Sequence, residues 1–326
     1  MSMEKQKDYT LQKSRSYRSV LAAGFHLYTE NFRRLFKASW LMALGFAVVC
    51  GALGTVAAIK IPEMTVAAIR QINTLQGIYF EGLLSYGVVL AALIGLVLLA
   101  IVTLALASAT LLNKLKEHKM EGSISMPARW LAISTRLMGR TLKGVGLTLL
   151  LMLIPLAAVI AMIIAADLIS QQFIARHIIT ITSTFAVVTI IALLLELPLA
   201  YVLMKYIMEA PCSYWKTLRK HYSNGMHHWS TLFLAFFVSI LLVTLAALVV
   251  MMPAHILNLA NQIAQMGLLM GDPLGMPTYM TLLTFVTFML CCFIGFYVSQ
   301  VTLMHNYYLY GSIEAKEKEK MKIIYP

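Results

Sequence analysis

The stretch TLFLAFFVSILLVTLAALVVMMPA, Thr231 to Ala254, is almost entirely apolar and contains no Asp, Glu, Lys or Arg. A helix that crosses the hydrocarbon core of a bilayer, roughly 30 Å thick, needs about 20 such residues. This stretch therefore predicts a transmembrane helix, and it decides the class of the fold.

Five further apolar runs are also long enough to cross a bilayer, and four of them contain no Asp, Glu, Lys or Arg. Together the six predicted spans are Ala38–Ile59, Leu83–Leu112, Val145–Ala166, Ile178–Met204, Thr231–Ala254 and Tyr279–Met304. The composition agrees, since the chain is 60% hydrophobic and 12% charged, whereas about a quarter of the residues are charged in an average soluble domain. We predict an all-α polytopic membrane protein with six transmembrane helices.

The basic residues collect on one side of these spans. Of the 26 Lys and Arg residues, 23 lie in the N-terminal segment through Lys37, in Asn113–Lys143, in Lys205–Ser230 and in His305–Pro326. The alternate connections carry only Lys60, Arg70 and Arg176. Because cytoplasmic loops are rich in Lys and Arg, both termini are predicted to be cytoplasmic, in a bacterial inner membrane. The net charge of +12 then favours anionic lipid over nucleic acid as the partner.

The spans pair into three hairpins, which we place at residues 19–112, 124–204 and 211–304, between a basic N-terminal arm (1–18) and a charged C-terminal tail (305–326). A basic amphipathic segment precedes spans one, three and five. In the first segment the apolar stripe is Leu21, Phe25, Tyr28, Phe32, Leu35 and Phe36; in the third it is Trp215, Leu218, Tyr222, Met226 and Trp229. We predict that each segment is a cytoplasmic helix in the plane of the membrane interface. The alternative is a short cytoplasmic helix packed on the bundle.

Cations on these segments are the candidate ligands for lipid headgroups. They are Arg33, Arg34, Lys37, Arg136, Arg140, Lys143, Lys216 and Lys220. Each cation near an anionic membrane surface contributes about 1 kcal/mol of attraction.

Hairpins one and three share a second pattern after their first spans. An apolar residue and a proline, Pro62 or Pro253, open each segment, and a Gln-Ile pair follows at the same distance, Gln71-Ile72 or Gln262-Ile263. We interpret both segments as extracytoplasmic amphipathic helices lying over the bundle, and the shared plan as an internal repeat.

Two segments carry a resemblance to a known group. YIMEAPCSYWKTLRKHYSNGMHHWSTLF (Tyr206–Phe233) and FHLYTENFRRLF (Phe25–Phe36) resemble the recurring elements of bacterial six-span proteins related to the membrane domain of glycerophosphodiester phosphodiesterases and to the DUF975 and YIP1-like families. The resemblance implies a membrane-embedded helical module. It implies no phosphodiesterase activity, because the catalytic domain of those enzymes has no counterpart in this sequence.

Glu196 is the one acid well inside a span, in the sequence LLLELPLAYVLMK. Intramembrane acids are costly and often functional, for example in proton relays. Glu196 lies nine residues before Lys205, about 13 Å along a helix, so pairing with a cation at the cytoplasmic face is the other interpretation.

Spaced histidines would be needed for an iron-dependent membrane enzyme, and the chain has no His-x-x-His or Glu-x-x-His pattern. No sequence motif assigns a catalytic, cofactor-binding or metal-ligating residue, so an enzyme is the weaker expectation. We expect a scaffold or a lipid-interacting accessory subunit, bound to lipid and to a membrane-protein partner or a second copy of the chain. The first alternative is a transporter or lipid-handling permease that uses Glu196, and the second is an enzyme with histidine-bound iron.

Overall fold

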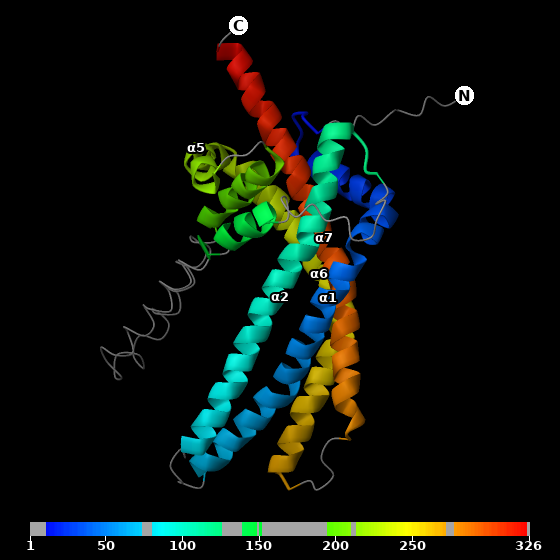
Figure 1. The fold of residues 1–326 in the computed structure, drawn as a ribbon, viewed down its shortest axis with the longest axis vertical. Coiled ribbons are helices and arrows are strands. Elements are labelled where there is room, and N and C mark those ends of the chain that lie inside the picture. The colour runs from blue at the N-terminus through cyan, green and yellow to red at the C-terminus, as the bar shows by residue number, and fades with distance from the viewer. Residues whose placement is uncertain are drawn as a thin grey trace, which may run out of the picture. The chain divides into compact units, whose positions relative to one another are not determined.

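The computed structural model describes residues 11–73, 80–125, 139–148, 150–151, 194–209, 213–271 and 277–324. Every regular element in these residues is an α-helix. The labelled helices are α1 (Tyr17–Asn73), α2 (Phe80–Glu121), α5 (Tyr214–His227), α6 (Trp229–Leu269) and α7 (Tyr279–Ile324) (Figure 1). Residues 139–148 and 194–208 are also helical. The all-α class is therefore confirmed.

Four of these helices, α1, α2, α6 and α7, are long and apolar enough to cross a membrane. They contain the first, second, fifth and sixth predicted spans. Most of the third and fourth predicted spans, with Arg136 and most of the segment before the third, lies outside the described residues; residues 145–148 and 194–204 within these spans are helical.

The basic segment before the first span is not a separate helix, so this part of the prediction is wrong. α1 runs without interruption for 57 residues, about 85 Å at 1.5 Å per residue. Between Arg33 and Trp40 the sequence contains no Gly or Pro that would end the helix. By contrast, the segment before the fifth span does form its own helix, α5, which ends at His227 before α6 begins at Trp229.

The predicted apolar stripe at the start of α1 is divided by the structure. Phe25 and Phe32 are exposed, whereas Tyr28 and Leu35 of the same stripe are buried. The helix also packs closely at Gly24, where a Cβ atom would lie only 2.6 Å from the ring of His305.

The segments after Pro62 and Pro253 are not separate helices lying over a bundle. Both prolines stand inside continuous helices, α1 and α6. Proline removes one backbone hydrogen bond from a helix, but here the helix continues beyond it. The two segments are therefore extensions of the helices that contain the first and fifth spans.

The chain divides into two compact units. We call residues 1–34, 112–240 and 302–326 the polar unit and residues 35–111 and 241–301 the apolar unit. Each of the four long helices contributes residues to both.

In the apolar unit, large apolar side chains on α2 and α6 are exposed, such as Val88, Leu98 and Val249. Contiguous exposed apolar surface of this kind is rare on soluble monomers. These helices are of the kind that a bilayer solvates, which supports a membrane-embedded protein.

Tyrosines dominate the core of the polar unit. The largest fully buried side chains there include Tyr201, Tyr214, Tyr307, Tyr308 and Tyr310. Tyrosine adds a hydroxyl to a large apolar ring, and a buried hydroxyl needs a partner. This core therefore requires polar and charged groups around it.

The charged C-terminal run EAKEKEKMK, Glu314–Lys322, is helical. It is the continuation of α7, which ends at Ile324. Its first turn is largely shielded from solvent, and the chain is exposed only from Lys318 onward.

Candidate functional site

A buried ion pair joins two distant parts of the polar unit. The Nζ atom of Lys205, at the end of helix 194–208, lies 2.5 Å from Oε1 of Glu314 on α7. The two side chains are only 8% and 13% exposed. The hydroxyl of Tyr201, one helical turn before Lys205, donates to the same carboxylate oxygen at 2.6 Å. Glu314 therefore accepts two bonds at one oxygen, and the pair is fixed in place.

Glu209 and Tyr310 extend this network to a second carboxylate. Lys205 also lies 3.2 Å from Oε1 of Glu209, one turn later in sequence. That carboxylate accepts a hydrogen bond from the hydroxyl of Tyr310 at 3.3 Å. Glu209 is 40% exposed, so its pairing with Lys205 is weaker than that of Glu314.

A second lysine, Lys119, brings α2 into the same network. Its Nζ atom donates to the hydroxyl of Tyr310 at 3.0 Å and to the backbone carbonyl of Met208 at 3.2 Å. The same cation lies 5.2 Å from the centroid of the Tyr310 ring. We call Lys119, Tyr201, Lys205, Glu209, Tyr310 and Glu314 the charge network. It connects α2, helix 194–208 and α7.

His221 on α5 lies within the electrostatic reach of this network. Burial lowers the pKa of His221, and the positive charge of Lys205 lowers it further. Its buried Nδ1 atom has no hydrogen-bond partner in the described part of the chain. A lowered pKa keeps the imidazole neutral near pH 7, so His221 adds no third cation next to Lys205.

Helix α5 is held against Pro198. A proline cannot donate to the carbonyl four residues earlier, here that of Leu194, and the indole nitrogen of Trp229 donates to this oxygen at 3.2 Å. Tyr222 donates to the next carbonyl, Leu195, at 2.7 Å. A Cβ atom on Gly225 would lie 2.9 Å from the Pro198 ring. Proline and glycine together thus create the contact surface for α5.

The C-terminal part of α7 forms further contacts within the polar unit. Nε2 of His228 lies 2.7 Å from Oε1 of Glu317. The backbone N–H of Arg15 donates to the hydroxyl of Ser312 at 3.0 Å, and this hydroxyl donates back to the carbonyl of Arg15. The residues after the predicted sixth span therefore hold Arg15, just before α1, and His228, just before α6, in place.

The charge network has the chemistry of a structural cluster. Its charged groups pair with one another, with tyrosine hydroxyls and with a backbone carbonyl. In the residues that the structure describes, no group of three or more His, Cys, Asp or Glu side chains could hold a metal ion.

Glu196, the acid that the sequence singles out, lies in helix 194–208 but outside the charge network. It is partly exposed, and within the described residues it forms neither a hydrogen bond nor an ion pair. The expected pairing with a cation at the cytoplasmic face is thus not observed in this part of the chain.

The structure divides the candidate headgroup ligands into two groups. Six are exposed: Arg33, Arg34, Lys37, Lys143, Lys216 and Lys220. Arg34, although exposed, donates to the carbonyl of Ile124 at 2.8 Å. Arg140 donates to the carbonyl of Tyr206, with its guanidinium 4.4 Å from the centroid of that ring. Arg140 therefore makes its contacts inside the polar unit, unlike the exposed cations.

Sequence inspection missed Glu314 and Lys205 as partners. One signal was present, since Glu314 follows Tyr310 at helical spacing in the segment YYLYGSIE. A tyrosine-rich helical face that ends in an acid is more typical of a buried polar cluster than of a solvated helix.

Comparisons of the chain with protein-family models, with curated proteins and with solved structures found no match. The resemblance to six-span membrane modules therefore stays a prediction.

Proposed function

We propose that this protein is a non-enzymatic integral membrane protein of the bacterial inner membrane that acts as a scaffold or lipid-interacting accessory subunit. In this proposal the chain has six spans in three hairpins, and both termini are cytoplasmic. The polar unit then lies at the cytoplasmic face, where most of the basic residues are.

The observation that carries the proposal is the orientation of α5. Tyr214, Thr217 and Gly225 are buried, whereas Trp215, Lys216 and Lys220 are exposed. A helix that exposes an indole and ammonium groups next to membrane spans is typical of the bilayer interface, where tryptophan lies at headgroup level and lysine meets anionic lipid. The sequence allowed two interpretations of this segment, a helix in the membrane interface and a helix packed on the bundle. Both contribute to the proposal, because α5 packs on its unit and offers its other face to lipid.

The charge network supports a scaffold in a second way. Its buried ions pair with one another, so they fix the arrangement of three helical segments of the polar unit. The exposed cations outside the network remain available to lipid. A membrane scaffold needs such a rigid unit to present a constant surface to its partner.

The orientation predicts which positions an impermeant thiol reagent reaches. In a chain from which all four native cysteines are removed, Met270→Cys should be labelled in intact cells, or in spheroplasts where an outer membrane intervenes, because Met270 is 84% exposed on the predicted outer side. Ser123→Cys and Lys320→Cys are also exposed positions but should react only after the cells are permeabilised. Labelling of Ser123→Cys in sealed cells would reverse the orientation.

The lipid interaction predicts a charge-dependent lipid selectivity. When Arg33, Lys37, Lys216 and Lys220 are all changed to Gln, each lost cation should remove about 1 kcal/mol of attraction to anionic lipid. The measurement is the association of spin-labelled phosphatidylglycerol, relative to phosphatidylcholine, with the full chain reconstituted in bilayers. Selectivity for phosphatidylglycerol should fall steeply at low salt.

Arg140→Gln provides the matched control. Arg140 is used inside the polar unit, so its loss should lower stability and leave lipid selectivity unchanged. If the quadruple variant kept its selectivity, or if Arg140→Gln reduced it equally, the exposed cations would not be the lipid contacts.

A further inference from the structure

A long charge-free helix extends beyond the predicted fifth span. α6 contains no Asp, Glu, Lys or Arg in its 41 residues, and it is about 60 Å long at 1.5 Å per residue. That is twice the roughly 30 Å thickness of the hydrocarbon core. The half of α6 that follows Pro253 nevertheless exposes apolar side chains, among them Leu259, Ile263 and Met266.

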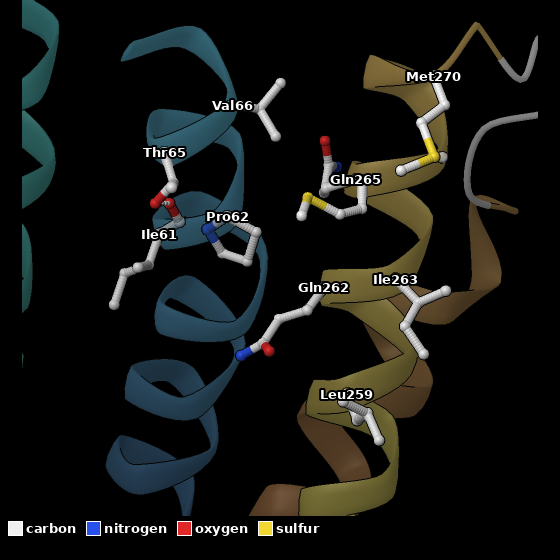
Figure 2. Close-up of a pocket in the computed structure, with 11 residues that line it drawn as sticks. Ile61, Pro62, Thr65, Val66, Leu259, Gln262, Ile263, Gln265 and Met270 are labelled. Carbon is white, nitrogen blue, oxygen red and sulfur yellow. Dashed lines mark hydrogen bonds between the residues drawn. The ribbon is translucent and has the colours of Figure 1, made fainter. Parts of the chain in front are cut away.

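A pocket lies between this half of α6 and the part of α1 around Pro62, entirely within the apolar unit. Its volume is about 600 Å³, within the range of roughly 300–1,000 Å³ that is usual for small-molecule sites. In Figure 2, Pro62 lies on the side of α1 that faces α6, and Gln262 reaches from α6 toward α1. The extensions that the sequence marks as a repeat therefore form the two walls of one pocket.

The lining selects an apolar molecule with an uncharged polar end. Its side chains are apolar apart from Thr65, Gln262 and Gln265, and none of them is ionisable. An amide both donates and accepts hydrogen bonds, so the two glutamines suit hydroxyl and ester groups. In the described part of the chain neither glutamine side chain forms a hydrogen bond.

The charged side chains that the structure describes beside the pocket on α1 do not change this selection. They are Lys60 and Glu63, which pair with each other at 2.7 Å. A carboxylate or phosphate in the pocket would meet no uncompensated cation from this pair, whereas burial of an unpaired charge is costly.

We propose that this pocket binds the acyl chain of an uncharged glycerolipid, a monoacylglycerol or a diacylglycerol, whose hydroxyl and ester groups meet Gln262 and Gln265. The inference rests on the proposed function and specifies the lipid class. The ligand comes from the adjacent leaflet of the bilayer, because the pocket adjoins the predicted ends of the first and fifth spans. The apolar walls hold the chain, and the glutamines recognise the head.

The test uses the full chain in nanodiscs of phosphatidylcholine and a monoacylglycerol with a diazirine in its acyl chain. After illumination, peptide mass spectrometry should place the label on lining residues such as Met266. Thr65→Trp, which fills the pocket, should lower this labelling about tenfold, the effect of losing about 1.4 kcal/mol of binding free energy. Ile256→Trp is the control, since Ile256 is exposed on α6 but does not line the pocket.

Competition experiments test the lipid class. Unlabelled monoacylglycerol should displace the probe, and a fatty acid at a pH where it is ionised should not. Gln262→Leu should weaken displacement by monoacylglycerol. Labelling that spreads evenly over the exposed apolar faces, or that survives Thr65→Trp, would mean ordinary boundary lipid and would overturn the site. Equal competition by the fatty acid would overturn the uncharged head group.

These outcomes can be distinguished from a failure of the proposed function, whose test uses cations on α1 and α5 outside the pocket. Loss of pocket labelling in Thr65→Trp with unchanged phosphatidylglycerol selectivity would confirm the pocket as a separate site. Absence of pocket labelling with normal selectivity would overturn the pocket alone.

Discussion

Glu314→Gln should lower the free energy of unfolding by about 3 kcal/mol, the cost of leaving a buried charge without its partner. Lys205 would keep its positive charge at 8% exposure and retain only the more exposed Glu209 as a counter-ion. The amide oxygen can still accept the bond from Tyr201, so the loss reports the ion pair and not the hydrogen bond. Thermal unfolding of the full chain in mild detergent, followed by tryptophan fluorescence, measures the effect.

Glu196→Gln is the matched control because the chemical change is the same. Glu196 has no ion-pair or hydrogen-bond partner in the described residues, so its stability effect should stay within about 0.5 kcal/mol. Equal losses in the two variants would contradict the assignment of Glu314 as the structural acid. A stable Glu196→Gln chain that lost a pH-dependent flux in proteoliposomes would replace the scaffold by the transporter alternative.

A double variant separates the ion pair from general disruption. Lys205→Met combined with Glu314→Leu removes both charges and keeps most of the volume. Replacement of a buried ion pair by apolar residues is often neutral or stabilising, so this variant should recover most of the stability lost in Glu314→Gln. If it were as unstable as Glu314→Gln, shape and not charge would explain the loss.

The apolar helices were predictable because their signal is local. The structure begins α7 at Tyr279 and α6 at Trp229, at or within two residues of the predicted span starts. A run of about 20 apolar residues can satisfy its backbone in a membrane only as a helix, so no distant information is needed.

The charge network was not predictable because its signal is distant. Lys205 and Glu314 are 109 residues apart, and a run of alternating charges after a span is usually solvated. Glu196 is the more conspicuous acid in the sequence because it lies inside an apolar run, although it has no hydrogen-bond or ion-pair partner among the described residues.

The limits of helices were harder to predict than their existence. The patterns before the first and fifth spans look alike, yet α1 continues and α5 ends. The last turn of α5 contains Gly225, a poor helix former, whereas the residues just before the first span, Asn31 to Lys37, include no glycine. This local difference separates a continuous helix from a helix pair.

Gly54→Leu should destabilise the contact between α1 and α7 in the apolar unit by about 1–3 kcal/mol through overpacking. A Cβ atom at Gly54 would lie 2.4 Å from the ring of Phe288, and one at Gly51 would lie 3.0 Å from Cβ of Met289. Small residues let helices approach closely in membranes, and a leucine would force them apart. The fraction of folded protein after heating, measured by size-exclusion chromatography, reports the effect.

Gly45→Leu is the control on the same helix, because a Cβ atom at Gly45 meets no other atom within 4 Å. It should be neutral or slightly stabilising, since leucine is the better helix former by about 0.8 kcal/mol. Phe288→Ala in the Gly54→Leu background should restore part of the loss by making room for the new side chain. Equal destabilisation by both glycine substitutions would mean that a leucine on the surface of α1 lowers stability even without a contact. The loss in Gly54→Leu would then not come from Phe288, and the close approach of α1 to α7 would be contradicted.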